Sequence, residues 1–214
     1  SFSETISILY NATDKYGKTI HLISKEVYED KLSSEGNAKK RTLRLGKDLK
    51  FISKESGILY VPSTHQGNSQ ASLEEVVCIE KIIKELLKCE FYDPIQNSFQ
   101  KISNKDILIV APYNHQVRML KDKLPKGIDI GTVDKFQGRE AEVVIISMTS
   151  SDIFEAPRGM EFLMAKNRLN VALTRGKTLA IIVGSEDLHE PEARTIEDME
   201  LQNFYLSLMK YASK

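Results

Sequence analysis

The sequence of 214 residues predicts an α/β fold of three layers, in which helices cover both faces of a mostly parallel sheet of about five strands. Several short apolar runs show no polar alternation, which is typical of strands that are buried on both faces. Segments of helical period separate these runs, and they supply the crossover connections that parallel strands require. Hydrophobic residues make up 41% of the chain, which is enough to fill a core on each side of such a sheet.

The first 56 residues are predicted to lead into the sheet domain, which is assigned to residues 57–214. Residues 6–10 are apolar enough for a strand, and residues 21–32 have the period of an amphipathic helix. Residues 33–50 are rich in Lys and Arg and offer little to bury, so we expect a loop or hairpin on the surface there.

A regular pattern begins at residue 57, where an apolar run predicts the first strand of the domain. Ser72 and Glu75 have the spacing of a capping box, in which Ser72 accepts from a helix amide and Glu75 reaches back to the cap. They predict a helix that ends at about Lys88, and a polar gap follows it. Further strands are predicted at residues 106–113, 127–133, 142–149 and 178–184, and further helices at residues 114–124, 167–175 and 196–212.

Bulk composition limits the classes of partner and site. Lys and Arg balance Asp and Glu at 30 each, so net charge gives no reason to expect nucleic acid, and any basic surface must be local. Cys78 and Cys89 are expected to be free thiols in a reducing compartment, and no Cys or His stands at zinc-ligand spacing from them, so no metal site is predicted. No signal peptide and no apolar run near 18 residues is present, and we expect a cytoplasmic chain without a membrane partner.

Polar side chains stand beside three predicted strands, and ligands of parallel sheets bind at the carboxyl ends of strands. In the first of these segments, Pro112 and Tyr113 end the strand predicted at residues 106–113. Asn114 follows and can cap the next helix. A turn of this kind is common between strand and helix, so alone it indicates little.

The second segment, residues 132–140, packs polar groups, a Phe and a Gly between two buried strands. Thr132 has a hydroxyl suited to a phosphate oxygen, and Gln137 and Glu140 can bridge or accept hydrogen bonds. Gly138 permits a tight turn. We therefore interpret this loop as functional, against the alternative of a solvated charged loop.

The third segment carries Arg168 and Arg175, which are seven residues apart and therefore predicted to share one helix face. Arg175 stands at the helix end, beside Gly176 and just before a buried strand, where we expect it to project from a fixed scaffold. An arginine in such a position can neutralise charge on a transferring phosphoryl group.

Together these segments resemble the second RecA-like domain of superfamily 1 helicases, in the branch that moves 5′ to 3′. "ILIVAPYNHQVRML" resembles motif IV, "GTVDKFQGREAEVVIISMTSS" resembles motif V, and "NRLNVALTRGKTLAIIVG" resembles motif VI. The resemblance is specific over residues 106–184 and is nearest to bacterial helicases joined to a RecB-like nuclease. It implies a RecA-like, P-loop NTPase type of fold and an ATP-dependent helicase.

On the nucleotide side, the resemblance implies that Arg175 is the motif VI arginine finger that contacts the γ-phosphate. Glu140 matches the motif V acid at the nucleotide, and Gln137 matches the residue between nucleotide and nucleic acid, with Gly138 beside it. ATP and magnesium would be held mainly by a first RecA-like domain of the same protein, which this chain lacks. The chain alone is therefore expected to be inactive.

On the strand side, Thr132, Pro112 and Tyr113 match positions that face single-stranded nucleic acid. Contacts of this kind are mostly to the backbone and carry no sequence information. DNA is favoured over RNA as the strand, and a linked nuclease domain is a further partner that the resemblance suggests.

Two departures from the family leave alternatives open. The Tyr-Arg-Met element, whose Arg is a second phosphate contact, is replaced here by "DKYGKTIHL", and no acidic pair follows an apolar strand before motif IV. One alternative is a non-catalytic module that binds nucleic acid or protein on a RecA-like scaffold. The retained Gln137, Glu140 and Arg175 favour the motor over that module, since binding alone needs no phosphate sensor.

Another alternative is a self-contained nucleotide site at residues 12–19, which have the spacing of a phosphate-binding loop. Gly17 is the only glycine in that stretch, although glycines allow the backbone to approach phosphates closely. Asp14 and Tyr16 would crowd an anion there. We therefore disfavour a nucleotide site in this stretch.

Overall fold

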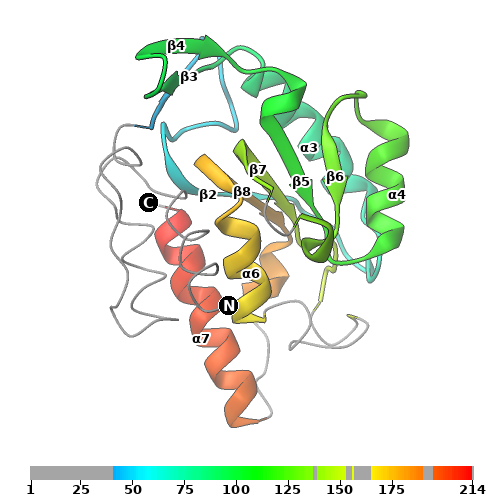
Figure 1. Cartoon of the computed structure of the whole chain (residues 1–214). Coiled ribbons are helices and arrows are strands. Elements are labelled where there is room, and N and C mark those ends of the chain that lie inside the picture. Colours follow the sequence, from blue (N-terminus) through cyan, green and yellow to red (C-terminus); the bar gives the residue numbers. More distant parts are fainter. Residues whose placement is uncertain (1–40, 137–138, 153–155, 157–164, 190–194, 214) are drawn as a thin grey trace.

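The computed structural model describes residues 41–136, 139–152, 156, 165–189 and 195–213 (Figure 1). The strand and helix predicted within the first 40 residues lie outside the described residues, as do residues 12–19, Gln137 and Gly138. Within the described residues, no helix is both long and apolar enough to cross a membrane.

A sheet of five parallel strands forms the centre of the molecule, in the order β2-β8-β7-β5-β6. Each strand follows an apolar run of the sequence. The strands are β2 (Gly57–Pro62), β5 (Ile107–Val110), β6 (Asp129–Gly131), β7 (Ala141–Ser147) and β8 (Gly176–Gly184). The predicted number of strands and their parallel arrangement are confirmed.

Helices cover both faces of this sheet (Figure 1). One face packs on α3 (Leu73–Leu86) and α4 (Asn114–Lys123), and the other packs on α6 (Lys166–Leu173) and α7 (Ile196–Ala212). Successive strand residues point to opposite faces, so both sides of each strand need apolar side chains. This requirement explains the missing polar alternation and confirms a three-layer fold of the RecA-like, P-loop NTPase type.

A second, small antiparallel sheet was not predicted. It consists of β1 (Leu43–Arg44), β3 (Glu90–Asp93) and β4 (Ser98–Lys101). The β3–β4 hairpin lies in the stretch interpreted as a polar gap, and Leu43, in the stretch with little to bury, is only 1% exposed. Strands this short show no clear period, although the cross-strand pair of Tyr92 and Phe99 was a readable signal.

The capping box predicted at the start of α3 is only half present. Ser72 caps the helix by accepting from the Glu75 amide at 3.1 Å, as predicted. The Glu75 side chain does not return to the cap, because the Ser72 amide donates to Oε1 of Gln116 instead, at 2.8 Å. Glu75 therefore turns inward, where it is fully buried.

The described residues before β2 pack onto the same core as the sheet domain. The carboxylate of Glu85 on α3 accepts from the amides of Lys50, Phe51 and Ile52, at 2.7, 2.9 and 3.1 Å. Lys54 donates through Nζ to the carbonyl oxygen of Ala212 at 2.7 Å, at the carboxyl end of α7. Cationic side chains are favourable at that end of a helix.

Replacing Glu85 with Gln should destabilise the fold in a pH-dependent way. Burial favours the protonated acid, but the three amide donors outweigh it, so the pKa of Glu85 lies below its ordinary value. A depressed pKa stabilises the fold above the unfolded pKa, and this contribution is lost as pH falls through the folded value. We expect Glu85→Gln to cost about 2 kcal/mol near neutral pH.

That difference should shrink as pH falls below the unfolded pKa, about 4, and should vanish below the folded pKa, where the acid is protonated in both states. Urea unfolding of both proteins across pH measures it. Glu80→Gln is the matched control, because the Glu80 side chain is 42% exposed on the same helix and pairs with Lys84. If the loss of stability in Glu85→Gln did not vary with pH, the ionised carboxylate of Glu85 would not be what stabilises this contact.

Candidate nucleotide and nucleic-acid site

The predicted site residues lie at opposite edges of the sheet. Pro112 follows β5 and Thr132 follows β6, so both lie at the carboxyl edge. Glu140 comes directly before β7 and Arg175 directly before β8, at the amino edge. Arg175 therefore lies just before a buried strand, as its position in the sequence predicted. A crossover between parallel strands starts at one edge and must end at the other.

The segment of residues 132–140 is that crossover, and its middle is anchored in the core. Its 3-10 helix η4 (Val133–Phe136) ends at Phe136, whose side chain is 0% exposed among the residues that face α6 and α7. A Cβ on Gly131 would lie 3.1 Å from the Phe136 ring, so glycine at this position allows the ring to pack. The buried ring of Phe136 thus anchors the first part of the crossover in the core.

Arg175 does not project from the scaffold as predicted, since it is only 2% exposed. Its Nε donates to the carbonyl oxygen of Val171 at 3.0 Å. Its Nη1 donates to the carbonyl oxygens of Phe136 and Arg139, at 3.5 and 3.4 Å. Burial lowers the pKa of Arg175, and the nearby charge of Glu140 opposes this effect. The guanidinium therefore sits against the crossover backbone.

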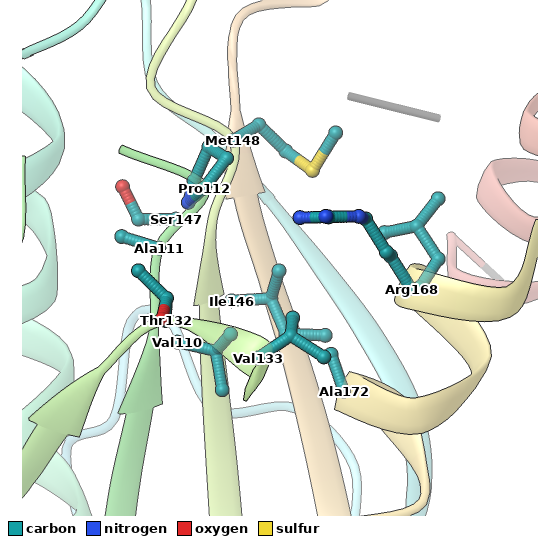
Figure 2. Close-up of a pocket in the computed structure, with 11 residues that line it drawn as sticks. Val110, Ala111, Pro112, Thr132, Val133, Ile146, Ser147, Met148, Arg168 and Ala172 are labelled. Carbon is teal, nitrogen blue, oxygen red and sulfur yellow. The ribbon is translucent and has the colours of Figure 1, made fainter. Parts of the chain in front are cut away.

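Arg168 and Arg175 face different parts of the molecule, although their spacing predicted a shared helix face. The helix α6 ends at Leu173, and Arg175 lies beyond the capping residue Thr174. Arg168 extends from the first turns of α6 into a pocket at the carboxyl edge of the sheet (Figure 2). Arg168 in α6 thus lies toward the carboxyl edge of the sheet, and Arg175, just beyond the helix, lies at the amino edge.

The pocket at the carboxyl edge brings together two of the three residues predicted to face nucleic acid. Pro112, Thr132, Ser147, Met148 and Arg168 line it, with apolar side chains beneath them (Figure 2). Its volume is about 30 Å³. This enclosed space has room for about two water-sized groups, which suits phosphate oxygens.

Tyr113, the third residue of that prediction, lies apart from the pocket. It is 7% exposed, packs among the residues that face α6 and α7, and occupies the N-cap position of α4. Conversely, sequence reasoning noted Arg168 but gave it no role, and it missed Ser147 and Met148 entirely. Their positions directly after or at the end of an apolar strand were the available signal.

The residues at the amino edge carry opposite charges. Arg175 offers a fixed positive charge, and Glu140 lies close enough to influence its titration. In the described part of the chain, no group of three or more His, Cys, Asp or Glu side chains could hold a metal ion. None of the described residues is therefore assigned to magnesium.

Comparison of the sequence with known proteins places the chain in a family. Residues 16–187 match the AAA domain family. The chain is 45% identical over 87 residues to the DNA polymerase alpha-associated DNA helicase A of Schizosaccharomyces pombe, covering 39% of this chain and 13% of that protein. It is 29% identical over 206 residues to the uncharacterized ATP-dependent helicase MJ0104 of Methanocaldococcus jannaschii, covering 87% of this chain and 27% of that protein.

A third relative is the mouse DNA replication ATP-dependent helicase/nuclease DNA2, 39% identical over 87 residues, which are 39% of this chain and 8% of that protein. The chain thus spans less than a third of the length of each of these relatives. These matches support the helicase-like character that the motifs suggested. The family match covers most of the chain, and the chain belongs to the AAA domain family.

Proposed function

We propose that this chain is the second RecA-like motor domain of an ATP-dependent helicase of superfamily 1. It would act with a first RecA-like domain of the same protein, which would make most of the contacts to ATP and magnesium. The fold, the helicase names of the relatives and the small share of each relative that the chain covers all support this assignment.

One observation carries the proposal: a single crossover joins the two candidate contact regions. Thr132 begins the crossover at the carboxyl edge, and Glu140 ends it at the amino edge. Between them, the carbonyl oxygens of Phe136 and Arg139 accept from Arg175. A change at Arg175 therefore has a direct physical route to Thr132.

In this proposal Arg175 acts as the arginine finger. The Nε contact with Val171 is short and anchors the side chain, whereas the two Nη1 contacts are at the long end of hydrogen bonding. Exchanging those long contacts for a phosphate oxygen costs little. ATP held by the first domain would supply that oxygen, and Arg175 would stabilise the charge that develops on it.

Movement of Arg175 then releases the crossover. Once Nη1 leaves the carbonyl oxygens of Phe136 and Arg139, the crossover loses two of its contacts, and Thr132 can shift relative to a bound strand. Gln137 and Gly138, which lie between these two carbonyl groups in the sequence, are proposed to relay the change. Repeated closure and opening would step the protein along the strand.

Thr132, Pro112 and Tyr113 are proposed to form the strand-facing side, with Arg168 beside them. The size of the pocket favours contact with backbone phosphate over contact with a base. Single-stranded DNA is the favoured substrate, because two of the relatives are named for DNA. A linked nuclease is proposed from the name of the mouse relative.

The alternative, a non-catalytic binding module on the same scaffold, is favoured by one observation. Arg175 is almost fully buried and makes only internal contacts among the described residues, as a purely structural arginine would. In that case the chain would bind nucleic acid without any response to nucleotide in the full-length protein.

Thr132→Val should weaken binding of a fluorescent single-stranded oligonucleotide by about fivefold, because the loss of one hydrogen bond is worth about 1 kcal/mol. Fluorescence anisotropy at fixed salt measures the change. Thr42→Val is the matched control, since Thr42 adjoins β1, in the small sheet. Equal losses in both variants, or no loss in either, would remove Thr132 from the strand contact.

A further inference from the structure

A buried hydrogen-bond network lies where β7 ends, beside the pocket. At its centre is Glu75, which is 0% exposed. Its Oε1 accepts from His65 Nε2 at 3.0 Å and from the Thr149 amide at 2.8 Å, and its Oε2 accepts from the Ser147 hydroxyl. We define the Glu75 network as Glu75, His65, Gln116, Ser147, Thr149 and Ser151.

The directions of these hydrogen bonds are consistent with a carboxylate that accepts from every neighbour. Gln116 Nε2 donates to Ser147 Oγ at 3.1 Å, so the single hydroxyl proton of Ser147 is available for Glu75. If His65 donates from Nε2, its Nδ1 can accept from Ser151 Oγ at 2.7 Å. Burial raises the pKa of Glu75, and its hydrogen bonds oppose that rise.

Ser151, His65 and Glu75 are linked in the order found in hydrolytic triads, but a catalytic role is excluded by burial. The side chains of His65 and Glu75 are both 0% exposed, and Ser151 is 2% exposed. A substrate cannot reach the serine oxygen. The network therefore acts on the protein itself.

The part of the protein that it holds is a strained turn. Thr149 has a φ of 72°, in the left-handed region that branched side chains avoid. The Ser150 amide donates to the carbonyl oxygen of Met148 at 2.8 Å, which closes a γ-turn of the rare, strained kind. The Thr149 amide points to Glu75, so the buried acid compensates for the strained backbone.

This turn continues into the walls of the pocket. Ser147 and Met148, directly before the strained residue, line the pocket. Gln116, which bonds to Ser147, lies in the first turn of α4, a few residues after Pro112, which also lines the pocket. The network therefore links the end of β7 to the start of α4 at the pocket.

We propose that Glu75 is a positioning residue for single-strand binding, which holds the end of β7 and the start of α4 in the geometry that backbone phosphate requires. This assignment rests on the proposed function, in which the pocket edge faces the nucleic acid. What Glu75 supplies is a set of accepted hydrogen bonds, and its side chain touches no ligand.

The test compares Glu75→Gln with Glu75→Met in the 214-residue chain. Gln keeps the volume and an acceptor for His65 and Thr149, whereas Met keeps the volume and removes every acceptor. We expect Gln to bind a single-stranded oligonucleotide within about twofold of the wild type, and Met to bind about tenfold more weakly. In the Met variant the Thr149 amide should also exchange with deuterium much faster.

Glu80→Met on the exposed side of α3 is the matched control and should bind normally. If Glu75→Met does not fold, Ser147→Ala removes only one donor to Glu75 and should weaken binding about threefold while speeding exchange at Thr149. Strand affinity at the wild-type level in whichever of these variants folds would overturn the inference, as would a Gln variant as weak as Met.

The Thr132→Val variant separates this inference from the proposed function. If Thr132→Val weakens binding and the Glu75 variants do not, Glu75 is no positioning residue, yet the strand contact stands. If neither change affects the affinity, the pocket edge does not face nucleic acid, and both ideas fail together.

Discussion

Replacing Arg175 with alanine should lower ATP turnover by the full-length protein by about a thousandfold or more, the usual contribution of an arginine finger. ATP binding should change little, because the proposed function assigns most of the nucleotide contacts to the first domain. The loss of turnover is expected because Arg175 lies against the crossover, where the proposal has it respond to phosphate and signal to Thr132. Steady-state turnover and a nucleotide-binding titration measure the two effects separately.

The same substitution should also destabilise the isolated chain, which sequence reasoning did not anticipate. Alanine removes a buried side chain whose guanidinium donates to the carbonyl oxygens of Val171, Phe136 and Arg139. We expect a loss of about 2 kcal/mol. Turnover must therefore be measured below the unfolding temperature of the variant.

Two variants separate catalysis from stability. Arg175→Lys keeps the positive charge but cannot anchor at Val171 and reach a phosphate at the same time, so turnover should stay low in a folded protein. Arg44→Ala is the matched control, since Arg44 is an exposed arginine of the small sheet. Unchanged turnover in both Arg175 variants would assign Arg175 a structural role only.

Replacing Phe136 with alanine should have the largest effect on stability, at about 4 kcal/mol, which is typical of a buried aromatic ring. For a chain of this length the unfolding temperature should fall by about 10 °C. The ring of Phe136 is fully buried and anchors the middle of the crossover in the core, so its removal loses apolar packing that alanine cannot supply. Thermal and urea unfolding of the 214-residue chain measure the loss.

Phe136→Leu is the control, because leucine keeps most of the apolar volume and should cost clearly less. The alanine variant should also bind single strands more weakly, since Thr132 begins the segment that Phe136 anchors. A cost below about 1 kcal/mol, the scale of an ordinary surface change, would show that the crossover is not anchored by this ring.

The central sheet could be predicted because its apolar runs are short, lack polar alternation and are separated by segments of helical period. The runs "ILIV" and "VVII" are typical of strands buried on both faces, and they form β5 and the core of β7. The ends of the strands were less predictable. The first of these strands stops at Val110, three residues before the predicted end, because Ala111 and Pro112 already belong to the turn into α4.

The small sheet and the buried acids could not be predicted in the same way. Leu43 lies in a polar stretch, and only its pairing with Phe91 on a distant strand shows why it is buried. Glu75 was interpreted as a capping-box residue, and Glu85 was not singled out. Their burial depends on donors from Thr149 and from the Lys50 region, whose positions are fixed only by the tertiary fold.

The candidate site divides similarly. Pro112 and Thr132 lie at one pocket. Glu140 and Arg175 come before their strands and therefore lie at the other sheet edge, because a crossover between parallel strands runs from one edge to the other. The burial of Arg175 depends on carbonyl groups that lie far from it in the sequence.

ATP hydrolysis by the 214-residue chain alone, with saturating single-stranded oligonucleotide and magnesium, tests most directly whether this is one half of a motor. We expect no turnover above that of the Arg175→Ala variant, because the proposed function assigns the arginine and the strand contact to this chain and the loop that holds the phosphates to the first domain. Robust hydrolysis stimulated by the oligonucleotide in the wild-type chain would contradict this, since it would require a complete nucleotide site within these residues.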